Sequence, residues 1–189
     1  LKGIYHKIKK YNDFKSLYLN NFVTGCTIIA RKDLIEKSLP LPKTSKYVLH
    51  DYWVSLIASQ TGTIAYVEES LIKYRQHKNN KVGSRKKSDT IETFKEMRDL
   101  FIDVKKQHFK VFIENENAFN SEKVKELNKK SLKYFEDLEK TKIINLKGWG
   151  LFFKLYRYEE FSYMMQNFLI LNIPCLAKIL FKVKKKMSK

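Results

Sequence analysis

The segment DYWVSLIASQ, residues 51–60, is the stretch on which the expected fold depends. Its apolar side chains recur so densely that the pattern predicts a helix buried on almost all sides. Asp51 falls in the first turn of this helix, where a carboxylate interacts favourably with the free backbone N–H groups and the helix dipole. The segment therefore predicts a buried helix that begins with an acidic residue.

Short β-branched runs lie on both sides of this helix. FVTGCTIIA, residues 22–30, is typical of a buried strand, with Gly25 marking a bulge or a close backbone approach. Residues 31–33 lead into a short helical segment, and residues 63–67 and 70–74 predict two further strands. The order strand, helix, strand, strand predicts an α/β fold.

The second half of the chain has a different composition, rich in Lys and Glu and almost free of glycine. Its periodicity predicts helices over residues 87–112, 121–139 and 149–171. The change in composition divides the chain into a first part, residues 1–86, and a helical extension, residues 87–189.

The composition narrows the class of protein. With 43% hydrophobic residues in 189, the chain can bury a core and is not a disordered segment. Its net charge of +18 favours anionic partners: nucleic acid, anionic lipid or a phosphorylated substrate. Cys26 and Cys175 show neither disulfide nor zinc spacing, which fits a reducing cytoplasmic setting. The N-terminal residues do not have the pattern of a signal peptide, and the longest apolar stretch, residues 168–181, is too short for a membrane span.

Four motifs occur in a fixed order in the first part of the chain. They are NFVTGCT at 21–27, HDYWVSLIA at 50–58, IAYVEESLIKYRQH at 64–77 and NKVG at 80–83. Together they resemble the C-terminal half of the catalytic domain of family 2 glycosyltransferases, which have the GT-A (Rossmann-like) fold, especially bacterial rhamnosyltransferase-like enzymes. The resemblance covers about residues 15–85.

The resemblance implies an inverting hexosyltransferase of cell-surface polysaccharide synthesis. The donor would be a nucleotide sugar, with dTDP-rhamnose as the family-based expectation, and the acceptor a glycan or a lipid-linked glycan. Inverting transfer needs a base that removes the proton of the acceptor hydroxyl.

Asp51 matches the position of that base in the family. The resemblance places Gly25 and His50 beside the substrate, and Tyr52 and Trp53 next to Asp51 could stack on a sugar ring. The competing interpretations are that Asp51 only caps its helix and that Gly25 is a simple β-bulge.

His77 matches a late histidine of the family that binds a divalent cation, Mg²⁺ or Mn²⁺, or contacts the donor diphosphate. Arg75, two residues earlier, could neutralise charge on the leaving phosphate; a solvated surface loop is the alternative for both. The chain departs from the family because no Asp-x-Asp motif occurs in it. The isolated chain is therefore expected to bind no donor and to be inactive.

The segment from residue 149 to residue 189 combines aromatic and basic side chains. This pattern is typical of an amphipathic segment on an anionic membrane surface, which would make the protein peripheral on the inner face of the cell membrane. A helix packed on the rest of the protein with a basic tail is the alternative. Two other classes stay open from the sequence: a nucleic-acid-binding module and a non-catalytic membrane-associated scaffold.

Overall fold

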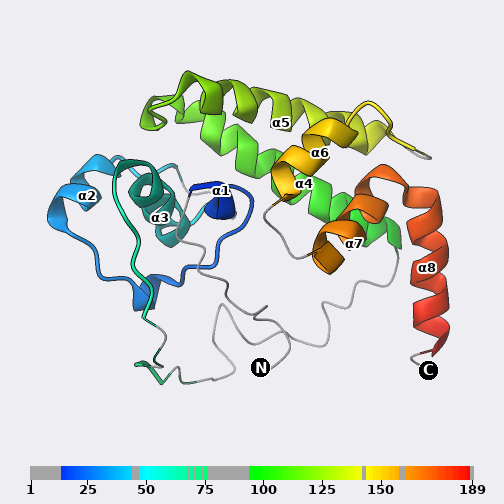
Figure 1. Cartoon of the computed structure of the whole chain (residues 1–189), viewed down its shortest axis with the longest axis horizontal. Coiled ribbons are helices and arrows are strands. Elements are labelled where there is room, and N and C mark those ends of the chain that lie inside the picture. The colour runs from blue at the N-terminus through cyan, green and yellow to red at the C-terminus, as the bar shows by residue number, and fades with distance from the viewer. Residues whose placement is uncertain are drawn as a thin grey trace.

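The regular secondary structure in the part of the chain that the structure describes is all helical (Figure 1). The computed structural model describes residues 14–43, 47–67, 69, 71–73, 75, 94–141, 144–157 and 161–187. Its helices are α1 (Phe14–Leu17), α2 (Lys32–Lys37), α3 (His50–Thr61), α4 (Phe94–Glu114), α5 (Glu122–Lys140), α6 (Trp149–Tyr156), α7 (Phe161–Asn172) and α8 (Pro174–Met187), with the 3₁₀ turns η1 (Gly25–Thr27) and η3 (Glu116–Ala118).

The predicted α/β, Rossmann-like GT-A fold is wrong, because the described residues contain no strand. The predicted strand at 22–30 is extended backbone interrupted by η1, and Ile29 in it is fully exposed. Residues 63–67 and 71–73 form neither helix nor strand and are largely exposed, and residues 70 and 74 of the predicted strand lie outside the described residues. β-branched residues favour an extended backbone, but a strand forms only where a neighbouring strand pairs with it.

The helical predictions are confirmed. The buried helix at 51–60 is α3, and the short helix that follows from residues 31–33 is α2. Helices α4 and α5 coincide with most of the stretches predicted at 87–112 and 121–139 and end one or two residues later; residues 87–93 lie outside the described residues. The third predicted stretch is two helices, α6 and α7, because α6 ends before Arg157. The predicted division at residue 86 falls in a stretch outside the described residues, and the described residues before and after it share one core.

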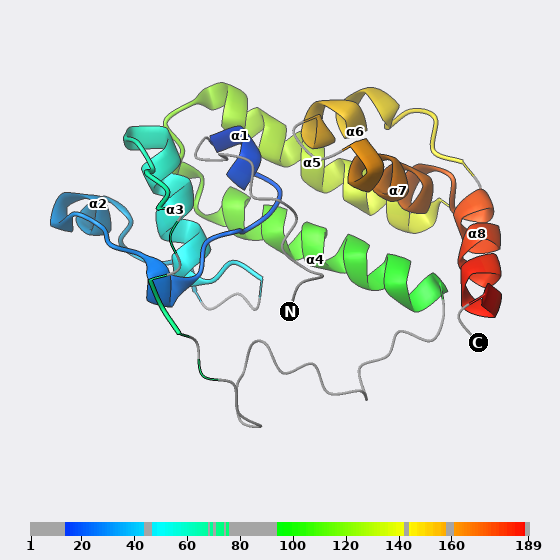
Figure 2. The same ribbon diagram turned by 60° about the horizontal axis from the view of Figure 1, so that its bottom comes forward.

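The core is built on the antiparallel pair α4 and α5, and α3 lies across one end of this pair (Figure 2). Helix α4 contributes Phe109 and Phe112, both fully buried. The Phe109 ring stacks on Phe135 of α5 at 5.8 Å, and Phe112 contacts Trp53 of α3 at 6.4 Å between ring centroids. Aromatic rings at these distances attract one another beyond the gain from burial alone. They fix α3 on the helical pair.

Arg98 of α4 joins the ends of two other helices. Its guanidinium donates to the carbonyls of Leu138 near the end of α5 (2.6 Å) and of Ile170 (3.2 Å) and Leu171 (3.5 Å) near the end of α7. The last carbonyls of a helix lack intrahelical partners and carry partial negative charge, so a cation is favourable there. Burial lowers the pKa of Arg98 from its usual value.

Lys105, further along α4, binds the segment that follows α1. Its ammonium donates to the carbonyl of Leu19 and, at 3.1 Å, to Oδ1 of Asn20. Two buried cations of α4 thus tie the long helix to both halves of the described chain.

The described part of the chain holds no single helix with the length and apolar character of a membrane span. Only α7 and α8 taken together reach it, as residues 163–172 and 174–180, and these two pieces meet at an angle of 119°.

Candidate functional site

The carboxylate of Asp51 lies in the first turn of α3 and is held by three hydrogen bonds. The Tyr52 backbone N–H donates to Oδ1 at 2.7 Å, and Asn21 Nδ2 donates to the same oxygen at 3.3 Å. The Gly25 backbone N–H donates to Oδ2 at 3.1 Å. Asp51 is 9% exposed, so these donors fix the direction of a carboxylate at the edge of the core.

Asp51 lies within the first turn, since Leu49 is the N-terminal flanking residue of α3 and makes no side-chain cap. The bond from Tyr52 satisfies one of the free N–H groups of the helix start, as a capping carboxylate does. The bonds from Asn21 and Gly25 come from a separate segment, which ordinary capping does not require. The carboxylate therefore both stabilises α3 and anchors the segment that crosses its start.

Gly25 lies so close to this helix start that a side chain at residue 25 would displace the His50 imidazole. A Cβ on Gly25 would lie 2.8 Å from Nε2 of His50 and 3.5 Å from Cβ of Asp51. The prediction of a close backbone approach is confirmed for these protein atoms, and the β-bulge is wrong because the described residues around Gly25 form no strand. Whether a sugar also contacts Gly25 stays a prediction.

His50 is the first residue of α3, and its side chain is exposed. Its Nε2 lies next to Gly25. Gly25 is also the residue whose backbone N–H donates to Oδ2 of Asp51, so the imidazole lies near that hydrogen bond. The structure thus brings together three of the predicted site residues: Gly25, His50 and Asp51.

Tyr52 and Trp53 do not fit their predicted role of stacking on a sugar. They are 2% and 1% exposed, so neither ring offers a face to a ligand. Tyr52 Oη donates to the Leu17 carbonyl at 2.7 Å, and Trp53 Nε1 donates to the Ser38 carbonyl at 3.0 Å. Both rings belong to the aromatic core, because a helix buried on several sides turns its large residues inward.

Arg75 is exposed, in the stretch of chain that follows α3. The three hydrogen bonds to the Asp51 carboxylate described above come from Tyr52, Asn21 and Gly25. His77 lies outside the described residues. The roles of both residues toward a donor diphosphate stay predictions.

The residues that the structure describes contain no group of three or more His, Cys, Asp or Glu side chains arranged to hold a metal ion. Asp51 and His50 are two such side chains at the site, too few for a protein-built cation site. The divalent cation, Mg²⁺ or Mn²⁺, stays a prediction of the family resemblance, because its expected ligand His77 lies outside the described residues.

Sequence reasoning missed Asn21 as a partner of Asp51 and His108 as a buried neighbour of α3. His108 Nε2 lies 3.1 Å from the Tyr52 hydroxyl, and the two residues are 56 apart in sequence. No local pattern connects them. Asn21 stands at the start of a motif already quoted, and a short amide side chain next to an extended run is the one local signal that points to it.

Comparison with known proteins adds nothing to these observations: no family model matches the chain, and neither a curated protein nor a solved structure does. The family resemblance rests on the quoted residues alone.

Proposed function

We propose that this chain supplies the acceptor-activating residues of a glycosyltransferase, with Asp51 as the general base. The observation that carries the proposal is the carboxylate of Asp51 fixed between the start of α3 and the Gly25 segment. A base must be positioned before its basicity matters, and this carboxylate is positioned by donors from two segments.

The two carboxylate oxygens of Asp51 differ in how many further hydrogen bonds they can accept. A carboxylate offers about four lone-pair sites, two on each oxygen. Oδ1 accepts from Asn21 and Tyr52, whereas Oδ2 accepts from Gly25. We therefore assign Oδ2 as the oxygen that receives a substrate proton.

In the proposed reaction, the acceptor hydroxyl donates to Oδ2 of Asp51. Its O–H bond breaks as the proton passes to the carboxylate, while the acceptor oxygen forms a bond to the anomeric carbon of the donor sugar. The bond from that carbon to the diphosphate breaks, and the electron pair leaves with the nucleotide. Attack opposite the leaving group inverts the anomeric configuration.

His50 would orient the acceptor. It is exposed at the start of α3, its ring lies next to Gly25, and either ring nitrogen can exchange a hydrogen bond with a sugar hydroxyl. The acceptor is a glycan or a lipid-linked glycan, and the donor is a nucleotide sugar. The family resemblance further implies that Arg75 and His77, together with a divalent cation, contact the diphosphate of the nucleotide sugar. The proposal includes these contacts.

The test is Asp51→Asn in the longest natural polypeptide that contains this chain, assayed for transfer from a nucleotide sugar such as dTDP-rhamnose. We expect turnover to fall about a hundredfold or more with little change in donor affinity, because a positioned base typically contributes that much. Asp33→Asn is the matched control. Asp33 also lies in the first turn of a helix, but it is exposed and bonded to Arg31 at 3.0 Å.

Circular dichroism must accompany both variants, since the amide introduced by Asp51→Asn can turn its own N–H toward the Gly25 N–H and weaken this contact. A folded Asp51→Asn protein with turnover close to that of Asp33→Asn would refute the assignment.

A further inference from the structure

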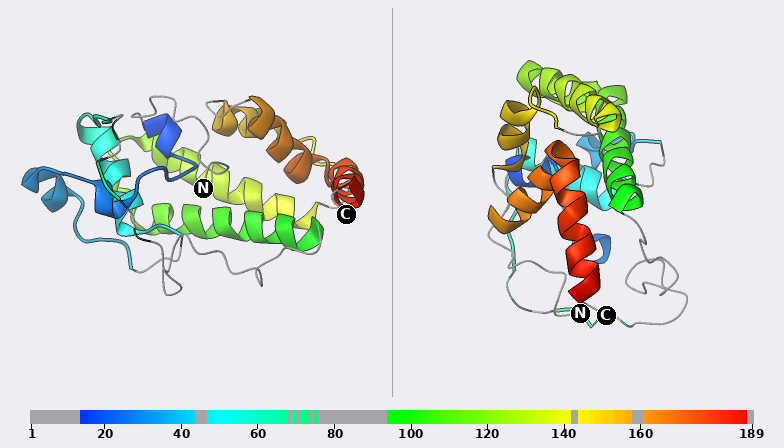
Figure 3. Two further views of the ribbon diagram at one scale, coloured as in Figure 1. Left: turned by 90° about the horizontal axis from the view of Figure 1, so that it is seen from below. Right: turned by 90° about the vertical axis from the view of Figure 1, so that its right-hand side faces the viewer.

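The last helix, α8, stands apart from the rest of the helical body. It follows α7 after a turn of 119° and runs along one end of the molecule (Figures 1 and 3). Of its described side chains, Pro174 and Ala177 are buried. The helix is thus joined to the body at its first turn, and residues 178–180 after this turn are exposed.

Three large apolar side chains of α8 are exposed. Leu176, Ile179 and Leu180 are 43%, 59% and 49% exposed. Residues three and four apart lie on the same face of a helix, so these three form one apolar strip. A contiguous strip of this kind on a polar protein marks a surface that contacts another phase or partner.

The charged residues of α7, α8 and the last two residues are all basic. Residues 161–189 include lysines at 178, 182, 184, 185, 186 and 189 and contain no Asp or Glu. A helix that combines an exposed apolar strip with this excess of lysine has the composition of interfacial helices that bind anionic lipid. Nucleic acid would account for the lysines but not for the exposed leucine and isoleucine side chains.

We propose that α8 docks this protein on an anionic lipid surface, with Leu176, Ile179 and Leu180 in the headgroup region and the lysines above it. The inference goes beyond the proposed catalytic function and does not depend on it.

The structure also narrows the membrane-binding segment predicted from the sequence. Phe152 and Tyr156 of α6 are fully buried and stacked on one another at 4.3 Å, and Phe168 of α7 is 6% exposed. For these aromatic residues of the predicted segment the alternative, packing on the rest of the protein, is confirmed. Phe153 and Phe161 of the same segment are 40% and 74% exposed, so not all of its aromatic residues pack on the core. The proposal assigns lipid binding to α8 because its exposed apolar side chains are next in sequence to the lysines. Deletion from residue 149 onward would remove part of the core.

The experiment is co-sedimentation of the full chain with vesicles of phosphatidylcholine containing about a quarter phosphatidylglycerol, at about 0.1 M salt. The variant is Ile179→Gln/Leu180→Gln, which keeps every charge. The matched control is Ile35→Gln/Leu41→Gln, which changes two apolar side chains of similar exposure, 39% and 44%, at α2 and in the loop after it. Figure 1 shows α2 at the opposite end of the molecule from α8.

We expect the native chain to sediment with the anionic vesicles and not with pure phosphatidylcholine. The α8 variant should bind about tenfold more weakly or worse, because two apolar side chains no longer leave water on binding. The control should bind as the native chain does.

Equal binding by the native chain and the α8 variant would overturn the proposal, since lysines alone would then explain the adhesion. Failure of the native chain to bind anionic vesicles would also overturn it. So would an α8 variant that loses affinity for a single-stranded RNA as much as for vesicles, because the strip would then serve nucleic acid.

Discussion

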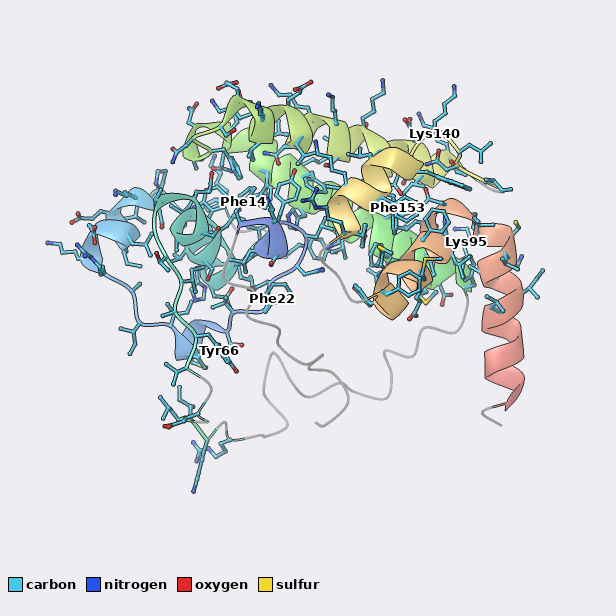
Figure 4. All side chains as sticks on the ribbon, in the orientation of Figure 1. Phe14, Phe22, Tyr66, Lys95, Lys140 and Phe153 are labelled. Carbon is cyan, nitrogen blue, oxygen red and sulfur yellow. The ribbon has the colours of Figure 1, made fainter. Side chains whose placement is uncertain are left out.

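The pair α4 and α5 and the extended segments on either side of α3 hold their apolar residues in opposite ways. Phe109, Phe112 and Phe135 in the helical pair are fully buried. In the extended segments, Phe22 and Tyr66 are 38% and 53% exposed, and Figure 4 shows both outside the helical body. The candidate site lies where the two regions meet, with Asp51 on the packed helix and two of its donors, Asn21 and Gly25, on the exposed segment.

The buried and the exposed region therefore contribute to the candidate site in different ways. The packed helices hold the carboxylate in place, because a side chain on a buried helix has few alternative positions. The extended segment supplies an amide donor from Asn21 and a backbone donor from Gly25, and most of its residues are exposed. Changes in the first region should affect stability strongly, and changes in the second should affect it weakly.

Phe112→Ala should have the largest effect on stability. Phe112 is fully buried and contacts Tyr52 at 6.2 Å and Phe119 at 5.2 Å between ring centroids. Truncation removes these contacts and leaves a cavity, so the free energy of unfolding should fall by about 3–5 kcal/mol. Urea unfolding followed by circular dichroism measures it.

Tyr66→Ala is the matched change in the exposed region, since Tyr66 is an aromatic residue that is 53% exposed. A substitution of an exposed surface residue usually changes the free energy of unfolding by about 0.5 kcal/mol or less. Equal losses for Tyr66→Ala and Phe112→Ala would break the comparison between the two regions.

His108 predicts how the stability of the packed region depends on pH. Burial, and secondly the nearby charge of Lys105, holds the pKa of His108 well below its usual 6.5. Its ring also lies against the Tyr52 hydroxyl. Below pH 6.5 the unfolded chain binds a proton that the folded chain does not, so stability falls as the pH decreases.

The expected slope from this group approaches about 1.4 kcal/mol per pH unit below the usual histidine pKa. Urea unfolding at several pH values between 5 and 7 measures it, and His108→Gln should flatten the curve over that range. An unchanged slope in the variant would show that His108 is not the group responsible.

Gly25→Ala should have a small effect on stability and sharpens the comparison at the site itself. The new methyl group would meet the His50 imidazole, which is exposed and able to turn away. A loss of about 1 kcal/mol or less in unfolding free energy is expected from this shift. A larger loss would mean that the Gly25 segment is packed as tightly as the core.

Gly150→Ala is the control for this substitution. Nothing lies within 4 Å of the new Cβ, and Gly150 is inside α6, so alanine should stabilise the protein by about 0.5–1 kcal/mol.

The helices could be predicted from the sequence because each helix has a local pattern of apolar and polar residues. The apolar density of α3 and the polar and apolar periodicity of α4 and α5 are local, and the structure has helices at these places. The predicted strands failed because pairing is not local. Residues 22–30 and 63–67 have strand-like composition, but the described part of the chain provides no partner strand for either.

The candidate site was predictable in part for the same reason. Asp51, His50 and Gly25 were singled out by motifs, and the structure brings them together. The inward direction of Tyr52 and Trp53 depends on α4, which lies far later in the chain. A pattern within residues 50–58 could not show which of its aromatic residues face the core.

The central claim, that Asp51 is a base and not only a structural carboxylate, is tested most directly by chemical rescue. Asp51→Ala in the longest natural polypeptide that contains this chain removes the carboxylate, and added formate can replace it as a proton acceptor. The account predicts that formate raises the rate of glycosyl transfer by Asp51→Ala in proportion to its concentration and leaves Asp33→Ala unchanged. A folded Asp51→Ala protein that retains native turnover, or whose low rate does not respond to formate, would contradict it.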